Sequence, residues 1–282
     1  MKSSLGNRLL LVMAALLFST GGAAIKSTSL TAWQVASFRS GVAAFVLLAA
    51  VPEARRGWSW RITPVAAAYA ATLILFVLAT RLTTAANAIF LQSTAPLYVW
   101  VLAPWLLGER RRRGEIWYIL MLVAGMSLFF AGADQGVATA PDPHRGNLIG
   151  LGSGIAWALT MTGLRWLGRG SGEAMAPVAL GNLVAFLAAF PMALPLAGGG
   201  KGDVAVILYL GIVQIGLAYV FVTRAIRYVP AFEATAVLLL EPVMNPVWAW
   251  LIRGETPGSW ALAGGLLILS ATLAHTWRAR IA

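Results

Sequence analysis

The sequence predicts an all-α integral membrane protein with ten transmembrane helices, arranged as two inverted-topology repeats of five helices each. The composition supports this class, because 59% of the residues are hydrophobic and only 11% are charged, whereas soluble proteins carry about 25% charged residues. The apolar residues also occur in blocks of roughly 18 to 24, the length of a helix that crosses about 30 Å of hydrocarbon. The arrangement in two halves is indicated by an internal duplication.

The duplication is clearest where Leu78–Glu109 recurs as Arg224–Glu255. With a constant offset of 146 and no gaps, nine of the 32 positions are identical. Alanine matches arise easily in apolar sequence, but the identical positions also include an arginine, a proline and a Gly-Glu pair: Arg81/Arg227, Pro96/Pro242 and Gly108-Glu109/Gly254-Glu255. We therefore interpret the two halves as copies of one unit.

The ten spans are expected at residues 8–25, 32–51, 62–79, 84–107, 116–133, 147–166, 175–197, 204–222, 230–252 and 259–276. The first span has the layout of a secretory signal, a basic start followed by an apolar run. The sixth span repeats that layout, since each begins near an asparagine and ends on a base (Asn7 and Lys26; Asn147 and Arg165). We therefore expect an uncleaved first helix. The chain divides into a first repeat (1–133), an extracytoplasmic linker (134–146) and a second repeat (147–282).

With ten spans, both termini lie on one face of the membrane, and the basic residues are unevenly shared between the faces. Fifteen fall on the face of the termini: Lys2, Arg8, Arg55, Arg56, Arg61, Arg110, Arg111, Arg112, Arg113, Arg165, Arg169, Arg224, Arg227, Arg278 and Arg280. Five fall on the other: Lys26, Arg81, Arg145, Lys201 and Arg253. Cytoplasmic loops collect Lys and Arg, so both termini are expected in the cytoplasm.

The odd number of helices in each half has a further consequence. The second half must enter the membrane upside down relative to the first. Inverted-topology repeats are the architecture of secondary transporters, whose substrate site lies near the midplane where the halves meet. The sequence therefore predicts a carrier with a central cavity.

Other function classes find little support in the residues. There are no cysteines, and the two histidines, His144 and His275, lie in the linker and at the end of the last span. No metal-ligand cluster, no Gly-rich phosphate loop and no Ser/His/Asp arrangement is found. We therefore expect no enzyme activity, no metal and no cofactor, and transport driven by a gradient. The net charge of +11 is attributed to loops that face anionic lipid, and no nucleic-acid partner is expected.

Glu233 and Glu241 are the only acidic residues within an apolar span, and both lie in the ninth. A carboxylate at the centre of a transmembrane helix costs on the order of 2.5–3.5 kcal/mol, so it should face a cavity or a cation. Glu241 lies near the midplane, where helix breaks are expected at Pro242 and Pro246, and also at Pro96 in the first copy. Glu241 is interpreted as a substrate-ammonium or proton site, with a buried ion pair to Arg39 as the alternative. Glu233 is nearer the cytoplasmic end and is the second candidate for charge coupling.

Further candidates are polar or aromatic residues inside apolar spans. An aromatic pocket is expected from Trp157, Tyr98 and Tyr219, with core or lipid-facing packing as the alternative. Substrate hydrogen bonds are expected from Asn87, Gln92 and Gln214, although such side chains often only join neighbouring helices. A smooth helix face with small residues every fourth position is formed by Gly146, Gly150, Gly154 and Ala158, and it is interpreted as a packing or sliding surface.

The paired motifs resemble the drug/metabolite transporter superfamily of the EamA type. The likeness is carried by Ala85-Ala86-Asn87-Ala88, Pro96, Gly108-Glu109, Leu238-Leu239-Leu240-Glu241-Pro242-Val243 and Gly254-Glu255, and it covers about residues 8–276. It implies a ten-helix inverted-repeat fold that exports small metabolites, with a central cavity and with the last span of each half at the periphery. The chain also resembles bacterial inner-membrane exporters of amino acids, including aromatic ones. It departs from the family at Phe18, where a tryptophan is common.

The leading hypothesis is an inner-membrane exporter of small amphiphilic metabolites, foremost amino acids with large apolar or aromatic side chains, working by alternating access. Its partners are then the small-molecule substrate and the lipid bilayer. Proton coupling and facilitated transport both remain open. One alternative is a multidrug exporter for lipophilic cations, with Glu233 and Glu241 as counter-charges. The other is a membrane enzyme or lipid-handling protein, which should carry a polar catalytic cluster at the headgroup level.

Overall fold

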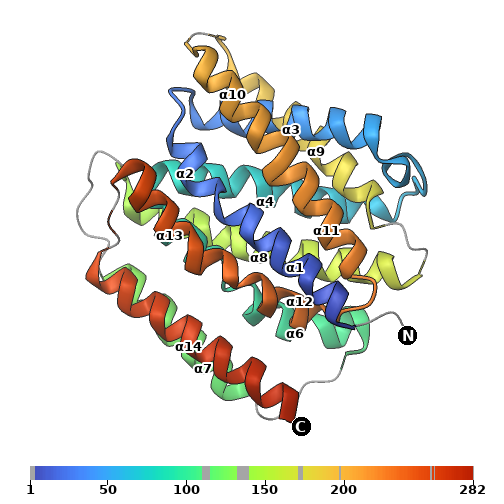
Figure 1. Ribbon diagram of the computed structural model, residues 1–282, viewed down its shortest axis with the longest axis vertical. Coiled ribbons are helices and arrows are strands. Elements are labelled where there is room, and N and C mark those ends of the chain that lie inside the picture. Colours follow the sequence, from blue (N-terminus) through green and yellow to red (C-terminus); the bar gives the residue numbers. More distant parts are fainter. Residues whose placement is uncertain are drawn as a thin grey trace.

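The computed structural model describes residues 4–109, 115–131, 140–170, 174–196, 198–254, 256 and 258–281, and the regular elements within them are helices. Each of the ten predicted spans coincides with a helix or a broken helix (Figure 1). In chain order these are α1 (Ser4–Ser19) with α2 (Gly21–Lys26), α3 (Ala32–Ala50), α4 (Ile62–Leu82), α5 (Ala85–Gln92) with α6 (Ala95–Leu107), α7 (Glu115–Ala131), α8 (Pro143–Gly170), α9 (Ala176–Ala193), α10 (Lys201–Tyr209) with η2 (Leu210–Leu217) and α11 (Ala218–Ala225), α12 (Ala231–Leu238) with α13 (Leu240–Arg253), and α14 (Ser259–Ile281). A short 3₁₀ turn, η1 (Pro52–Arg55), follows α3.

Most of the helices have the length and composition of membrane spans, but α8, the sixth predicted span, is not among them. Within the described residues, seven helical segments are long and apolar enough to cross a membrane. Two further helices contain shorter apolar runs, Ile116–Gly125 in α7 and Leu262–Ala271 in α14. The expected fold class, an all-α membrane protein, is confirmed.

Four of the passes change their backbone geometry along their length. The first bends at Thr20, between α1 and α2, and the eighth passes through a π-helix, η2. The other two are interrupted at Ser93-Thr94 and at Leu239. These interruptions lie just upstream of Pro96 and Pro242, because proline has no N–H to continue the preceding helix. The break expected at Pro246 is absent: this proline lies inside α13, which continues through the loss of one hydrogen bond.

The two broken helix pairs correspond to one another position by position. A shift of 146 carries α5 onto α12, and both α6 and α13 end on a left-handed glycine, Gly108 at φ 65° and Gly254 at φ 64°. In space, α5 packs against α13 and α6 against α12, so the two pairs run antiparallel.

The remaining architecture separates a main body from a peripheral pair. Figure 1 shows α7 and α14 side by side at one edge, and these helices pack mainly against each other. Gly125 allows this contact, because an added Cβ would lie 2.6 Å from Cγ1 of Ile268. The start of α1 and the end of α14 lie at one end of the bundle (Figure 1), which we name the termini end; the opposite end is named the far end.

The glycine face of α8 lies against α5 and the turn before it. An added Cβ at Gly146 would lie 2.7 Å from the Thr83 nitrogen, and one at Gly150 would lie 3.2 Å from Cβ of Leu91. At Gly154 it would lie 2.9 Å from the Leu91 carbonyl oxygen. These glycines therefore allow close approach of two backbones.

We expect Gly154→Ala to destabilise the protein by about 1–3 kcal/mol, because the new methyl group meets a backbone oxygen that cannot rotate away. Gly152→Ala is the matched control on the same helix, since its Cβ would meet only Cδ1 of Leu75, at 3.7 Å. Alanine favours the helix over glycine, so Gly152→Ala should be neutral or stabilising. Thermal unfolding in detergent measures both. Equal melting temperatures for the two variants would contradict the close packing of α8 on α5.

Candidate functional site

A cavity at the centre of the main body is lined by both halves of the chain. Its walls come from α1, α3, α4 and α5 in the first half and from α8, η2, α11 and α13 in the second: Phe18, Arg39, Thr72, Leu73, Phe76, Gln92, Trp157, Gln214, Ile215, Tyr219 and Glu241. We name it the central cavity. Its volume of about 30 Å³ has room for about two water molecules. An organic substrate therefore requires a more open conformation.

A smaller cavity of about 10 Å³ adjoins the central one and shares Gln92, Trp157 and Glu241 with it. Its remaining walls include Ser93 and Leu239, the residues at which the two broken helix pairs are interrupted. The helix breaks therefore border the cavities, as expected for discontinuous helices that form a transport site.

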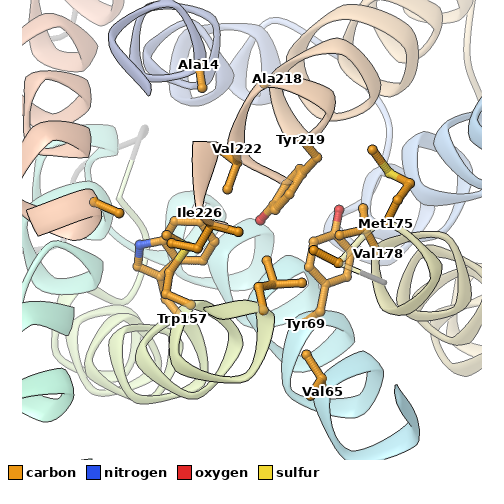
Figure 2. Packing of buried hydrophobic residues seen from close by; sticks show 14 of the residues in the cluster. Ala14, Val65, Tyr69, Trp157, Met175, Val178, Ala218, Tyr219, Val222 and Ile226 are labelled. Atoms are coloured by element: carbon orange, nitrogen blue, oxygen red, sulfur yellow. The ribbon is translucent and has the colours of Figure 1, made fainter. Parts of the chain in front are cut away.

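Aromatic rings form one wall of the central cavity. The ring of Tyr219 lies 5.0 Å from that of Phe18 and 6.1 Å from that of Trp157, in edge-to-face geometry. Figure 2 shows Tyr219 facing Tyr69, with Trp157 on the other side; the two tyrosine ring centres are 4.7 Å apart. Asn182 donates to the Tyr69 hydroxyl at 2.9 Å. Such a wall suits an apolar or aromatic group.

Two glutamines supply amide groups to the cavity. Gln92 Nε2 donates to Ser153 Oγ at 2.7 Å. Gln214 lies in the π-helix η2, and its Nε2 contacts the Phe18 carbonyl oxygen at 3.4 Å, whereas its buried Oε1 has no hydrogen-bond partner. Single π-helical turns often occur at functional sites. Among the described residues, Gln214 Oε1 is therefore a buried acceptor without a hydrogen-bond partner.

The cavity also holds one base and one acid. Arg39 on α3 is 1% exposed; its Nη2 donates to the Leu73 carbonyl at 2.9 Å, and its Nε has no hydrogen-bond partner among the described residues. Glu241 on α13 is 9% exposed, and the structure gives this described side chain neither a hydrogen bond nor an ion pair. The direct Arg39–Glu241 ion pair, the alternative interpretation of Glu241, is not formed.

Three other predicted residues lie outside the central cavity. Glu233 accepts a hydrogen bond from Arg8 Nε at 2.7 Å, in a partly exposed ion pair at the termini end. Asn87 donates to Asn147 Oδ1 at 3.3 Å, at the far end. Tyr98 is partly buried and packs against the main hydrophobic core. The predicted residues Trp157, Gln92, Gln214, Tyr219, Glu241 and Arg39 are brought together in the cavity.

Some lining residues carried no signal as site residues in the sequence. Thr72 and Phe76 are ordinary members of an apolar span, and Phe18 was notable only as a departure from the family pattern. The signal that finds them is spatial, because Phe18 contacts the rings of both Trp157 and Tyr219.

Buried hydrogen bonds join the end of α4, the start of α5 and α8 at the far end. Asn147 Oδ1 accepts from Thr83 Oγ1 at 2.9 Å as well as from Asn87, and the Asp142 backbone N–H donates to the Leu82 carbonyl at 3.0 Å. Asn147 and Thr83 are both fully buried. We name Thr83, Asn87 and Asn147 the far-end seal.

The termini end has a cavity, and it also has an ion pair at the place that corresponds to the seal. A cavity of about 400 Å³ there is lined by Asn7, Val51, Glu53, Met175, Val220, Thr223, Arg224, Arg227 and Tyr228. At the offset of 146, Thr83 and Asn87 of the far-end seal match Val229 and Glu233, neither of which lines this cavity. Glu233 is paired with Arg8, so corresponding positions are bridged at both ends.

A family model matches most of the chain. The EamA-like transporter family matches the chain in two stretches, residues 7–131 and 144–276. Curated relatives include the pseudopaline exporter CntI of Pseudomonas aeruginosa, from strains UCBPP-PA14 and PAO1, each 26% identical over 277 residues and 94% of both chains. A solved structure titled "Crystal structure of protein" shares the fold, with a TM-score of 0.71 and 20% identity over 99% of both chains. The helical membrane architecture and the two family matches together show that the chain belongs to the EamA-like transporter family.

Proposed function

We propose that this transporter exports small amphiphilic metabolites, foremost amino acids with large apolar or aromatic side chains. The observation that carries the proposal is the central cavity, which combines an aromatic wall with a base and an acid, Arg39 and Glu241, that form no ion pair with the described residues. An amino acid offers a complement to each of these. Export is supported by the relatives, which are named as exporters of another metabolite, pseudopaline.

Alternating access between two inverted repeats is the proposed mechanism. It is supported by the antiparallel packing of the two broken helix pairs, whose elements correspond at an offset of 146. A cavity of about 400 Å³ at the termini end, opposite the hydrogen-bonded far-end seal, also supports it. With fifteen of the basic residues on the termini side, that end is proposed to face the cytoplasm. The conformation is then proposed to face the cytoplasm, and the central cavity must still enlarge before it admits an organic substrate.

The experiment is a flux assay with purified protein in proteoliposomes. We expect saturable transport of radiolabelled phenylalanine and tryptophan, inhibited by unlabelled aromatic amino acids. Empty liposomes and liposomes with an unrelated membrane protein are the controls. Absence of flux for all amino acids, in protein that is folded by size-exclusion chromatography, would overturn the proposal.

Export of lipophilic cations is the second candidate, because an unpaired carboxylate beside aromatic rings also suits a cation. Tetraphenylphosphonium in the same assay separates the two. If this cation is transported and zwitterionic amino acids neither are transported nor compete, the second candidate replaces the first. Arg39 argues against it, because a cation in the cavity leaves that base unpaired.

Trp157→Ala is expected to weaken transport of aromatic amino acids about tenfold in apparent affinity, because edge-to-face ring contacts contribute about 0.5–1.5 kcal/mol beyond the area they bury. Leucine should be affected less, since it gains no such ring contact. Trp105→Ala is the control: this residue is 84% exposed on the bundle surface and should leave both substrates unchanged. Equal losses for phenylalanine and leucine would contradict a substrate contact of Trp157.

A further inference from the structure

We propose that Arg39 binds the carboxylate of the substrate while Glu241 binds its ammonium group, so that the transported species is a zwitterion. This inference rests on the proposed function and assigns the two ends of the substrate to named residues. It also makes Arg39 a specificity-determining residue, which selects against compounds that carry a cation alone.

The first step is the position of Arg39 within its helix. It lies in the middle of α3, is 1% exposed and lines the central cavity. Its Nη2 donates to a single carbonyl oxygen, that of Leu73, and its Nε has no hydrogen-bond partner in the part of the chain that the structure describes. No described acidic residue lies within 4 Å of its guanidinium. Burying an unpaired charge costs several kcal/mol, so an anionic partner is expected at some point of the transport cycle.

The second step is a comparison with other bases in the interior, which have structural partners. Lys26 donates to the carbonyl of Thr83, Arg81 to those of Thr28 and Leu30, and Arg165 to those of Ile226 and Arg227. Each of these bases binds carbonyl groups at helix ends or turns, where backbone acceptors lack intrahelical donors. Arg39 differs in position, because it is far from the ends of α3 and the Leu73 carbonyl that it binds lies inside α4. Binding to carbonyl groups at helix ends therefore accounts for the burial of Lys26, Arg81 and Arg165, but it does not account for the burial of Arg39.

The third step is the location of the acid. Glu241 borders the same cavity from α13, in the other half of the chain, and has no partner among the described residues. The two charges are not within ion-pair distance of one another, and the aromatic wall of Phe18, Trp157 and Tyr219 belongs to the same cavity. A substrate with a carboxylate, an ammonium group and an apolar side chain complements all three features. A zwitterion also adds no net charge to a cavity that already contains one base and one acid.

Competition by substrate analogues tests the assignment in proteoliposomes that transport radiolabelled phenylalanine. Phenylalaninamide lacks the carboxylate, and 3-phenylpropionate lacks the ammonium group. In the wild type we expect each analogue to compete at least tenfold more weakly than phenylalanine. The Arg39→Gln variant should bind phenylalanine and phenylalaninamide with similarly weak affinity. It should still bind 3-phenylpropionate more weakly than phenylalanine. Glu241→Gln should show the reverse pattern.

Two further variants serve as controls. Arg39→Lys keeps the positive charge and should restore part of the preference for phenylalanine over its amide. Arg61→Gln removes an exposed arginine at the start of α4 and should leave the preference unchanged. These patterns depend on which chemical group the substrate lacks, so general damage to the fold does not reproduce them.

The outcomes separate this inference from the proposed function. A wild type that transports no amino acid overturns the proposed function, and this inference with it. A wild type that transports phenylalanine, together with an Arg39→Gln variant that still rejects the amide, overturns this inference alone. If Arg39→Gln does not fold, the wild-type protein still tests the inference. If phenylalaninamide competes with phenylalanine transport as strongly as unlabelled phenylalanine does, Arg39 does not bind the substrate carboxylate.

Discussion

Replacing Glu241 with glutamine is expected to weaken the apparent affinity for amino acids by roughly 10- to 100-fold. Its carboxylate is the acidic group that lines the central cavity in the described residues, and it has no protein partner there. A hydrogen bond to a charged group contributes about 1.5–3 kcal/mol, which corresponds to that range at 1.4 kcal/mol per factor of ten. Glutamine has nearly the same shape, so the loss should appear in affinity and leave the amount of folded protein unchanged.

The same variant tests proton coupling. If the carboxylate takes up one proton in each cycle, flux through the wild type follows an imposed pH gradient, and glutamine abolishes that dependence. A pH dependence that survives in Glu241→Gln would exclude Glu241 as the coupling site. Concentration dependence and pH dependence are measured on the same proteoliposomes.

Glu233→Gln is the matched control for this prediction. It removes a carboxylate from the same pass of the chain, but Glu233 is paired with Arg8 outside the central cavity. We expect its KM to equal that of the wild type. A loss of affinity in Glu233→Gln as large as that in Glu241→Gln would contradict the assignment of the ammonium group to the central cavity.

The course of the helices could be predicted from the sequence, because hydrocarbon thickness and proline chemistry act locally. The ten apolar blocks coincide with helices, and Pro96 and Pro242 follow the two interruptions. The helix ends were predicted less accurately: α8 extends over Pro143–Gly170, beyond the predicted 147–166. Hydropathy marks where a helix crosses hydrocarbon, and it is insensitive to turns that continue into the aqueous layer.

The polar residues of the candidate site could also be predicted from the sequence. Gln92, Gln214 and Glu241 were found because a polar group within hydrocarbon is costly and therefore conspicuous. The same reasoning selected Asn87, which bonds Asn147 at the far end. Sequence alone could not separate these cases, since helix–helix hydrogen bonds and cavity groups use the same side chains.

The apolar residues that line the site could be identified only from the structure. A phenylalanine that faces a cavity and one that faces lipid are identical in an apolar run, so Phe18 and Phe76 could not be selected. The sequence also could not show whether Arg39 and Glu241 form an ion pair, because the same residues occur in either case. In the structure Arg39 and Glu241 line the same cavity without forming an ion pair. Because the two charges are separate, each can bind one charged group of a zwitterionic substrate.

A covalent link across the far-end seal is expected to reduce transport more than tenfold and reversibly. Thr83 Oγ1 and Asn147 Oδ1 are 2.9 Å apart, so cysteines at both positions lie within reach of a short thiol-specific cross-linker. The chain has no native cysteine, which leaves no competing thiol. In alternating access the far end must open to release substrate. A closed link therefore stops flux while it leaves substrate binding from the termini end intact.

The measurement compares flux and binding before cross-linking, after it, and after cleavage of a reducible linker. Each single-cysteine variant, treated in the same way, is the control for modification without a link. We expect flux to fall only in the double variant and to return on reduction, with phenylalanine binding retained throughout. Full flux through quantitatively linked protein would show that substrate does not leave past Thr83 and Asn147, and the proposed exit path at the far end would then be wrong. Loss of binding together with flux would instead mean that the link distorts the central cavity, and that the seal and the cavity move as one unit.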